Sequence, residues 1–273
     1  MKNKIFILLL FIAVSESFGQ FYFGAGIGTH ALQSSNVAAQ NSNANGFIVK
    51  AGFVKMVSKK FGIGVGAEFV QYNQDVSNGN IFNSNTFLVD DTNSAFEYRI
   101  KTTGYVEHQR LNAIQIPLFL QFKTRVNVGT NFYARAGAKY MLPQTFTTKA
   151  TANQVGGSGY YPDFNLLITD LPSRGFGSAP DYNASGSYQT KNVLLANIEF
   201  GFSFKVAKKS TIYAGFYLDK ATNSLIKNDS NQSFIGYNPN ATSNRPLNGI
   251  YTSNKNIEVK PNNVGLSLSY SFE

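Results

Sequence analysis

The sequence predicts an all-β fold, an eight-stranded antiparallel up-and-down transmembrane β-barrel with long extracellular loops. Three observations support this prediction. Eight segments alternate apolar residues with small or polar ones over about 9–11 residues, the length of a membrane-crossing strand. The apolar positions of these segments hold no charged residue, and the connections alternate between short and long. A ten-stranded barrel, with an extra hairpin from 160–190 or 230–260, is the structural alternative.

The first nineteen residues have the three parts of a secretory signal peptide. Lys2 and Lys4 precede an apolar run over 5–14, and small residues follow at Ser15, Ser17 and Gly19. The run is about half of the ~20 residues that a spanning helix needs. We therefore expect cleavage after Gly19, a barrel domain over 20–273, and export to the outer membrane of a Gram-negative bacterium.

The strands follow in order, and each has one apolar face. Every second residue is apolar within 21–27, 47–53, 61–69, 114–122, 132–140, 194–204, 212–218 and 264–272. A Lys or Arg on a lipid-facing midplane costs about 2–4 kcal/mol, which explains the absence of charge there. A soluble lipocalin-like barrel, with its apolar residues inside, is the alternative of a different class.

The opposite face is rich in Gly, Ser and Tyr, which suits a narrow lumen. We expect its polar side chains to pair with one another and to plug the barrel, because an unpaired charge in a narrow lumen is costly. A small gated pore is the alternative. This predicted lumen network consists of Lys50, Glu68, Gln115, Gln121, Arg135, Lys139, Asn197 and Glu199.

The connections separate two ends of the barrel. Short turns lie at 57–60, 124–131 and 206–210, and long polar segments at 33–45, 76–94, 143–190 and 222–262. Short turns face the periplasm and long loops the exterior in outer-membrane barrels. The polar but β-prone stretch 95–113 is predicted to extend the fourth strand beyond the membrane.

The net charge of +9 is concentrated at one end. The predicted exterior holds eleven basic and eleven acidic residues, Asp219 among the acids. Eight basic residues without an acid occupy the predicted periplasmic turns, and we expect this basic ring to meet anionic headgroups or an acidic periplasmic partner. Export makes nucleic acid an unsuitable partner. The basic ring comprises Lys55, Lys59, Lys60, Lys123, Arg125, Lys205, Lys208 and Lys209.

Catalytic and metal signatures are weak. The two histidines, His30 and His108, are expected at the solvated rim, and no Gly-x-Ser-x-Gly elbow is present. Asp90 and Asp91 lack calcium-loop spacing, and the chain has no cysteine. We therefore expect no enzyme, no cofactor and no metal. A girdle at the membrane interface is predicted for Tyr22, Tyr72, Tyr140, Tyr213, Tyr217 and Tyr270.

The long segments 143–190 and 222–262 have the Tyr, Ser, Gly and Asn composition of recognition loops. Their aromatic side chains are candidates for stacking on sugars or packing on a partner. Passive surface loops are the alternative. These candidates are Tyr160, Tyr161, Phe164, Phe176, Tyr182, Tyr188, Phe234, Tyr237 and Tyr251.

Three strand sequences, FYFGAGIG, LNAIQIPLFLQFK and VGLSLSYSF, resemble the PorT-like outer-membrane β-barrel family of Bacteroidota, small barrels of the OmpA/OmpX type. The resemblance covers roughly half of the mature chain. Gly265, Leu268, Tyr270 and Phe272 resemble a signal for the barrel-assembly machinery, although Glu273 follows the aromatic residue that usually ends it.

The resemblance implies an outer-membrane protein, and some members of the family act in type IX secretion and gliding. We expect a non-enzymatic accessory or scaffold subunit of an envelope complex for secretion or transport. A loop-mediated surface-binding or adhesion protein is the alternative, followed by a lipid-modifying enzyme or a small pore.

Overall fold

The computed structural model describes residues 19–35, 40–77, 81–227, 232–253 and 255–272. Of the predicted signal peptide, only Gly19 lies within the described residues. Among these residues no helix is long and apolar enough to cross a membrane. The strands are β1 (Gly19–Ser35), β2 (Gln40–Met56), β3 (Phe61–Ser77), β4 (Ile81–Val89), β5 (Ala95–Thr103), β6 (Val106–Asn127), β7 (Thr130–Tyr161), β8 (Leu166–Ile168), β9 (Gly177–Ser187), β10 (Val193–Ala207), β11 (Ser210–Ala221) and β12 (Glu258–Phe272).

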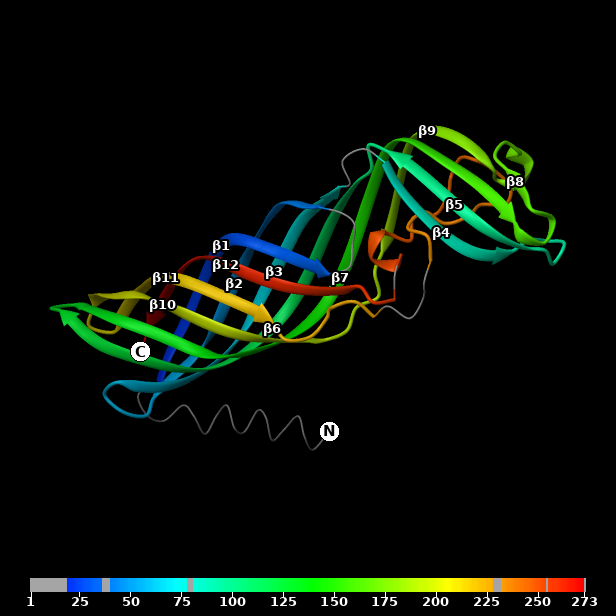
Figure 1. Ribbon diagram of the computed structural model, residues 1–273. Coiled ribbons are helices and arrows are strands. Elements are labelled where there is room, and N and C mark those ends of the chain that lie inside the picture. Colours follow the sequence, from blue (N-terminus) through cyan, green and yellow to red (C-terminus); the bar gives the residue numbers. More distant parts are fainter. Residues whose placement is uncertain (1–18, 36–39, 78–80, 228–231, 254, 273) are drawn as a thin grey trace, which may run out of the picture.

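Eight strands close into a barrel in the order β1, β2, β3, β6, β7, β10, β11 and β12, and every neighbouring pair is antiparallel (Figure 1). The closing pair is β12 with β1, in which Ala25 lies opposite Leu268. The eight-stranded prediction is confirmed, and the ten-stranded alternative is wrong. The hairpin β4–β5 and the strands β8 and β9 lie outside the ring, because they pair with one another or with the far half of β7.

The outer face of the barrel is apolar and the inner face is filled. Ile27 and Leu120 are 67% and 63% exposed, whereas the residues between the outward positions are mostly buried. The glycines make room for large rings inside. A Cβ atom at Gly52 or Gly66 would lie 2.6 or 2.8 Å from the hydroxyl oxygen of Tyr22. Glycines on the inner faces of β2 and β3 therefore leave space for the Tyr22 ring of β1, because the lumen of eight strands has little room.

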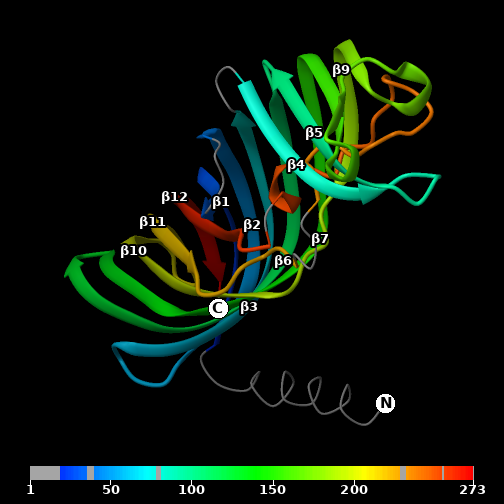
Figure 2. The same cartoon turned by 45° about the vertical axis from the view of Figure 1, so that its right-hand side comes forward.

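Strand β7 runs for 32 residues from Thr130 to Tyr161, and its second half carries a sheet beyond the barrel (Figure 2). We call this part, formed by β4, β5, β8, β9 and the far end of β7, the extension. Following the topology expected from the sequence, we label its end of the barrel the extracellular end and the opposite end the periplasmic end. The prediction that 95–113 extends the fourth strand holds from Val106 onward and is wrong for 95–103. Gly104 turns the chain at φ +64, so that Ala95–Thr103 forms the separate strand β5 and only Val106 onward belongs to β6.

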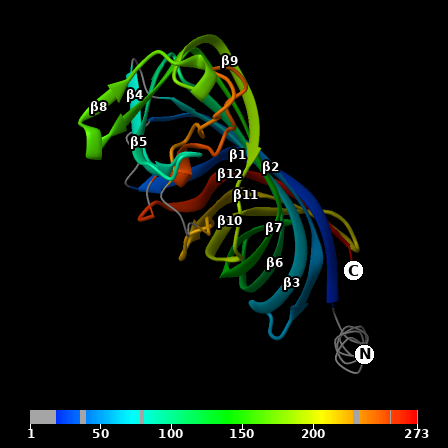
Figure 3. The same cartoon turned by 90° about the vertical axis from the view of Figure 1, so that its right-hand side faces the viewer.

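The long polar segments fold into a core of their own. The segment after β11, which contains the 3-10 helix η3 (Ile250–Thr252), packs inside the curve of the extension (Figures 1 and 3, orange). Phe96, Phe176, Phe234 and Tyr251 are fully buried there. Two further 3-10 turns, η1 (Pro162–Phe164) and η2 (Pro172–Arg174), connect β7, β8 and β9.

Candidate functional site

The lumen is closed near the periplasmic end by an arginine within a cage of aromatic rings. The Arg135 guanidinium carbon lies 5.1 Å from the ring centres of Tyr22, Phe119 and Tyr213, and 5.2 Å from that of Tyr133. Its Nε atom donates a hydrogen bond of 2.8 Å to Gln121 Oε1. Cation–π contacts of this kind compensate for the loss of water around a buried guanidinium.

The Glu199 carboxylate lies beside this cage and forms the second layer of the lumen network. Lys50 Nζ lies 2.9 Å from Glu199 Oε2, while the hydroxyls of Tyr133 and Ser267 each donate to Oε1 at 2.9 Å. Arg135 Nη1 lies 3.7 Å from the same oxygen. Both carboxylate oxygens therefore have partners, which is the condition under which a buried charge is tolerated.

Above this layer, Lys139 binds two carboxylates. Its Nζ atom lies 2.7 Å from Glu68 Oε2 and 3.0 Å from Asp219 Oδ2. Asp219 also accepts hydrogen bonds from Asn197 at 2.6 Å and Asn263 at 3.1 Å, and its side chain has no exposed surface. The prediction that Asp219 lies outside the barrel is wrong. The residue follows outward-facing Leu218, so the alternation places it in the lumen.

His30 and four tyrosines lie inside the barrel rather than at its surface. His30 is fully buried; its Nδ1–H donates to the Gln71 carbonyl at 2.9 Å and its Nε2 accepts from the Tyr217 hydroxyl at 2.8 Å. The prediction of a solvated rim histidine is therefore wrong. The predicted girdle is also wrong for Tyr22, Tyr72, Tyr213 and Tyr217, which are at most 4% exposed, whereas Tyr140 is 45% exposed on the outer face.

These layers fill the lumen and balance its charge. The structure brings all eight residues of the predicted lumen network to the inside of the barrel, each at most 6% exposed. With Asp219 included, three basic and three acidic side chains face one another. The aromatic residues Phe119 and Tyr133 were missed, although their parity along the strand identifies them as inward-facing. Within the described ranges no group of three or more His, Cys, Asp or Glu side chains is placed to hold a metal ion.

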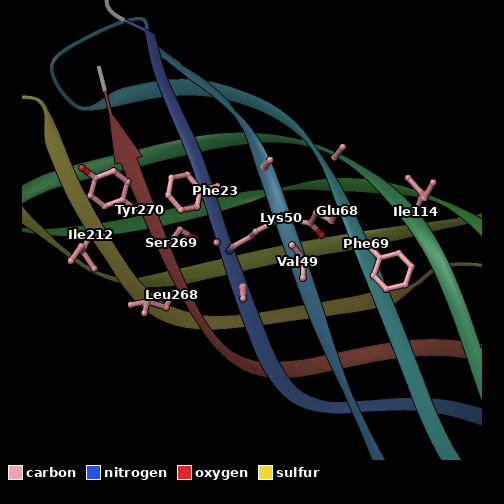
Figure 4. Close-up of a pocket in the computed structure, with 14 residues that line it drawn as sticks. Phe23, Val49, Lys50, Glu68, Phe69, Ile114, Ile212, Leu268, Ser269 and Tyr270 are labelled. Carbon is pink, nitrogen blue, oxygen red and sulfur yellow. The ribbon is translucent and has the colours of Figure 1, made fainter.

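A hollow of about 860 Å³ lies on the outer face, across the strands from β11 and β12 to β6. Figure 4 shows Leu268 and Ile212 on one side of it and Val49 and Phe69 on the other. Small outward residues such as Ala51 and Ala67, which lie opposite one another, form its floor. Because its outward side chains are apolar and lie in the lipid-facing belt, we expect acyl chains to fill it.

The structure buries most of the aromatic recognition candidates of the long segments. Phe176, Phe234 and Tyr251 have no exposed surface, and Tyr161 and Tyr188 are 6% and 7% exposed. These five rings form the core of the extension and present no face to solvent. Tyr160, Tyr182 and Tyr237 are half-buried, and Phe164 is 67% exposed. A recognition role remains a prediction for the accessible members of the set.

Two buried charges hold this extracellular core together, and sequence reasoning missed both. Glu107 accepts hydrogen bonds from the hydroxyls of Tyr105 and Tyr188, from Gln109, and from the backbone N–H of Ile250. Arg245 donates to the carbonyl oxygens of Val155, Gly175 and Gly177 at 2.9–3.1 Å. Glu107 on β6 therefore links that strand to Tyr188 and to Ile250 in the segment after β11. Arg245, within that segment, links it to β7 and to the start of β9.

An exposed row with apolar side chains at both ends crosses the tip of the extension. Phe87 on β4 lies opposite Glu97, Glu97 opposite Tyr160 on β7, and Tyr160 opposite Leu167 on β8. Phe87 is 75% exposed and Leu167 is 49% exposed. The Arg99 guanidinium lies 4.6 Å above the Tyr160 ring and also pairs with Glu97. We call these residues the tip row; of them, only Tyr160 was a sequence candidate.

The basic ring divides into two parts. Seven of its eight residues line a cavity of about 510 Å³. The three short turns lie at the end of the barrel opposite the extension (Figure 1). Lys55 is the exception. It lies opposite Ile63, which is 47% exposed on the outer face, so Lys55 belongs to the lipid-facing rim.

We expect the β4–β5 turn to weaken only in strong acid. The Thr92 hydroxyl and the amides of Ser94 and Thr92 donate to the Asp90 carboxylate, which lowers the pKa of Asp90 to about 2. A depressed pKa stabilises the fold above the ordinary Asp value of 3.8, and this stabilisation is lost as the pH falls through about 2. An NMR pH titration in micelles should show the Thr92 and Ser94 amide signals moving near pH 2. Movement centred near pH 4 would contradict the hydrogen-bonded turn, and Asp90→Asn should abolish the titration.

Comparisons with known proteins do not assign this chain to a family. No family model matches the chain, and no curated protein sequence matches it. The chain is similar to the solved structure of Ail, the attachment invasion locus protein of Yersinia pestis, with 12% identity over 94% of this chain and 100% of that chain, at a TM-score of 0.35. It is similar to the outer membrane protein OprG of Pseudomonas aeruginosa, with 13% identity over 95% of this chain and 99% of that chain, at a TM-score of 0.41. A third is the translocator domain of autotransporter NalP from Neisseria meningitidis, with 6% identity over 100% of this chain and 95% of that chain, at a TM-score of 0.27. The fold and the sites described above stand on the strands and contacts of this chain.

Proposed function

We propose that the protein is a non-enzymatic outer-membrane β-barrel that serves as an accessory or scaffold subunit of an envelope complex for secretion or transport. The tip row is the observation that carries this proposal. Its exposed apolar side chains lie beyond the barrel, where lipid does not cover them. Exposed apolar patches outside a membrane mark protein contacts.

The tip row has the make-up of a contact surface for protein. Two apolar side chains, Phe87 and Leu167, lie at the two ends of the row, and between them lie Tyr160, with Arg99 over its ring, and Glu97, which pairs with Arg99. Aromatic and arginine side chains are enriched at the centres of such surfaces. The underlying strands are held by a packed core, so that this surface is preorganised and loses little conformational freedom on binding.

The closed lumen favours a scaffold over a pore. Arg135 with its aromatic cage and Lys139 with its two carboxylates occupy the cross-section in successive layers. The side chains that have ionisable groups in the lumen are bound to one another rather than open to a substrate. The filled cross-section and the paired lumen charges both support a protein that binds partners at the ends of the barrel rather than passing a substrate through its lumen.

A co-purification experiment tests the proposal. The wild-type protein, the double variant Phe87→Ser/Leu167→Ser and the matched control Val57→Ser/Val128→Ser are expressed in the native host and purified in gentle detergent. Val57 and Val128 are 61% and 80% exposed at the opposite end of the barrel. We expect one stoichiometric partner with the wild type and the control, and at least about tenfold less of it with the tip variant.

Absence of a stoichiometric partner, or equal recovery with all three proteins, would contradict a scaffold role for the tip. Glycan-array binding by the wild type that is lost in the tip variant would instead favour the alternative, a surface-binding or adhesion protein. Quantitative mass spectrometry of the purified samples measures partner recovery, and the glycan array measures sugar binding, so that the two roles are distinguished.

A further inference from the structure

The end of the barrel opposite the extension is hollowed into a cationic cavity. Its volume of about 510 Å³ lies within the range of small-molecule sites, roughly 300–1,000 Å³. Seven basic side chains line it, and they come from the three short turns or from the strand ends beside them: Lys59 and Lys60 from the β2–β3 turn, Lys123 and Arg125 from the end of β6, Lys205 from the end of β10, and Lys208 and Lys209 from the β10–β11 turn. Three regions separated in the sequence therefore direct their positive charge to one place.

The positive charge of this cavity has no counter-charge within the described part of the chain. No Asp or Glu is among its lining residues, and none of the seven basic side chains forms an ion pair with a described residue. The lumen network above shows the opposite arrangement, since each of its cations faces a carboxylate. Like charges gathered in this way repel one another, and an anion bound between them relieves the repulsion.

Two features give the cavity a defined inner wall. Lys123 Nζ donates to the Tyr213 hydroxyl at 3.2 Å and lies 5.2 Å from the centre of the Tyr213 ring. The Tyr213 hydroxyl in turn donates to Gln20 Oε1 at 3.2 Å. The Tyr213 ring also belongs to the cage of Arg135, whose guanidinium carbon lies 5.1 Å from its centre, so a further positive charge lies just inside the lumen. The cavity is thus positive both at its rim and beneath its floor.

We propose that this cavity is a binding site for a phosphate-bearing ligand with two or more phosphate groups, a function separate from partner binding at the tip row. A phosphate group carries about −1.5 to −2 charges at neutral pH on one compact group, more than a carboxylate can supply. Six of the seven cations are lysines, whose point charges bind phosphate oxygens without requiring the flat geometry that arginine prefers. Gln20, Asn131 and Thr211 add neutral polar groups to the lining.

Titration calorimetry with tripolyphosphate as the probe tests this site. The wild-type protein in phosphatidylcholine nanodiscs should bind one equivalent, and the affinity should fall as salt rises toward 1 M, where the screening length is about 3 Å. The triple variant Lys59→Gln/Lys123→Gln/Lys208→Gln removes one cation from each turn or the strand end beside it. It should bind about tenfold to a hundredfold more weakly, because charge-assisted hydrogen bonds are lost.

Two controls separate the cavity from general charge. The variant Lys101→Gln/Lys149→Gln/Lys220→Gln removes the same charge from exposed positions of the extracellular half and should bind as the wild type does. Lys55→Gln removes a basic-ring charge that lies outside the cavity and should also have no effect. Absence of saturable binding, or an equal loss in the cavity variant and in either control, would overturn the proposal.

The source of the phosphate is distinguished by changing the lipid. In nanodiscs that contain cardiolipin, a lipid whose headgroup carries two phosphate groups, competition that weakens tripolyphosphate binding to the wild type indicates that lipid headgroups fill the cavity. Unchanged affinity in those nanodiscs indicates a free ligand from the periplasm. Both results support a phosphate site, because each requires saturable binding that the cavity variant lacks.

Discussion

Replacing Lys139 with methionine is expected to destabilise the barrel by about 3–5 kcal/mol, the cost of leaving a buried charge without its partner. The Lys139 ammonium holds Glu68 at 2.7 Å and Asp219 at 3.0 Å, and the three side chains are at most 5% exposed. Methionine has a similar length and no charge. Its introduction therefore leaves two carboxylates facing each other in a lumen that has little room for water.

Chemical unfolding of the purified protein in lipid vesicles, followed by gel mobility and tyrosine fluorescence, measures this loss. The triple variant Lys139→Met/Glu68→Gln/Asp219→Asn should recover part of the stability, since it removes the unpaired charges together with the cation. Lys220→Met, an exposed neighbour of Asp219, should change the free energy of unfolding by less than about 0.5 kcal/mol. Equal effects of Lys139→Met and Lys220→Met would contradict the ion-paired plug.

Replacing Glu107 with leucine is expected to release the segment after β11 from the extension while the barrel stays folded. Four donors converge on this carboxylate: the hydroxyls of Tyr105 and Tyr188, the Gln109 amide and the Ile250 backbone N–H. Leucine leaves these buried donors without an acceptor, at about 1–3 kcal/mol for each. The free energy lost with these four hydrogen bonds is expected to exceed the free energy that the packing of Ile250 and Tyr251 supplies.

Hydrogen exchange read by mass spectrometry locates this effect. Peptides over 232–253 should exchange at least about tenfold faster in the variant, whereas peptides from β1 and β12 should keep their protection. Glu258→Leu provides the control, because its exposed carboxylate pairs with Lys260 at the surface, away from the extension core. Faster exchange throughout the barrel, or none in 232–253, would show that Glu107 does not link these parts.

Alternation along the strands predicted the barrel and also the face of nearly every strand residue. The same rule places Tyr22 between outward Phe21 and Phe23, and Asp219 beside outward Leu218, so that both lie in the lumen. Our assignments of these two residues were wrong because they followed nearness to a strand end instead of parity. In a pleated strand parity is the stronger rule, since successive side chains point to opposite faces.

The long polar segments were beyond what the sequence could predict. Residues 95–103 and 143–161 have strand-forming residues, but their partners are set by contacts between segments far apart in the chain, such as Glu97 with Tyr160. The burial of Phe234 and Arg245 depends on how these strands curve, and no local pattern carries that information. Composition alone suggested open recognition loops, and the tertiary contacts turned most of their aromatic residues inward.

The sequence by itself determined the closed sheet, its apolar exterior and the basic character of one set of turns, because each follows from a period of two and from charge counted along the chain. Only the tertiary structure decided which charges meet and which remain without a partner. Glu68, Lys139 and Asp219 come together from three strands, and seven cations from three turns and the strand ends beside them surround one cavity. Such groupings depend on strand order and register around the ring, which bring distant residues within a few ångströms of each other.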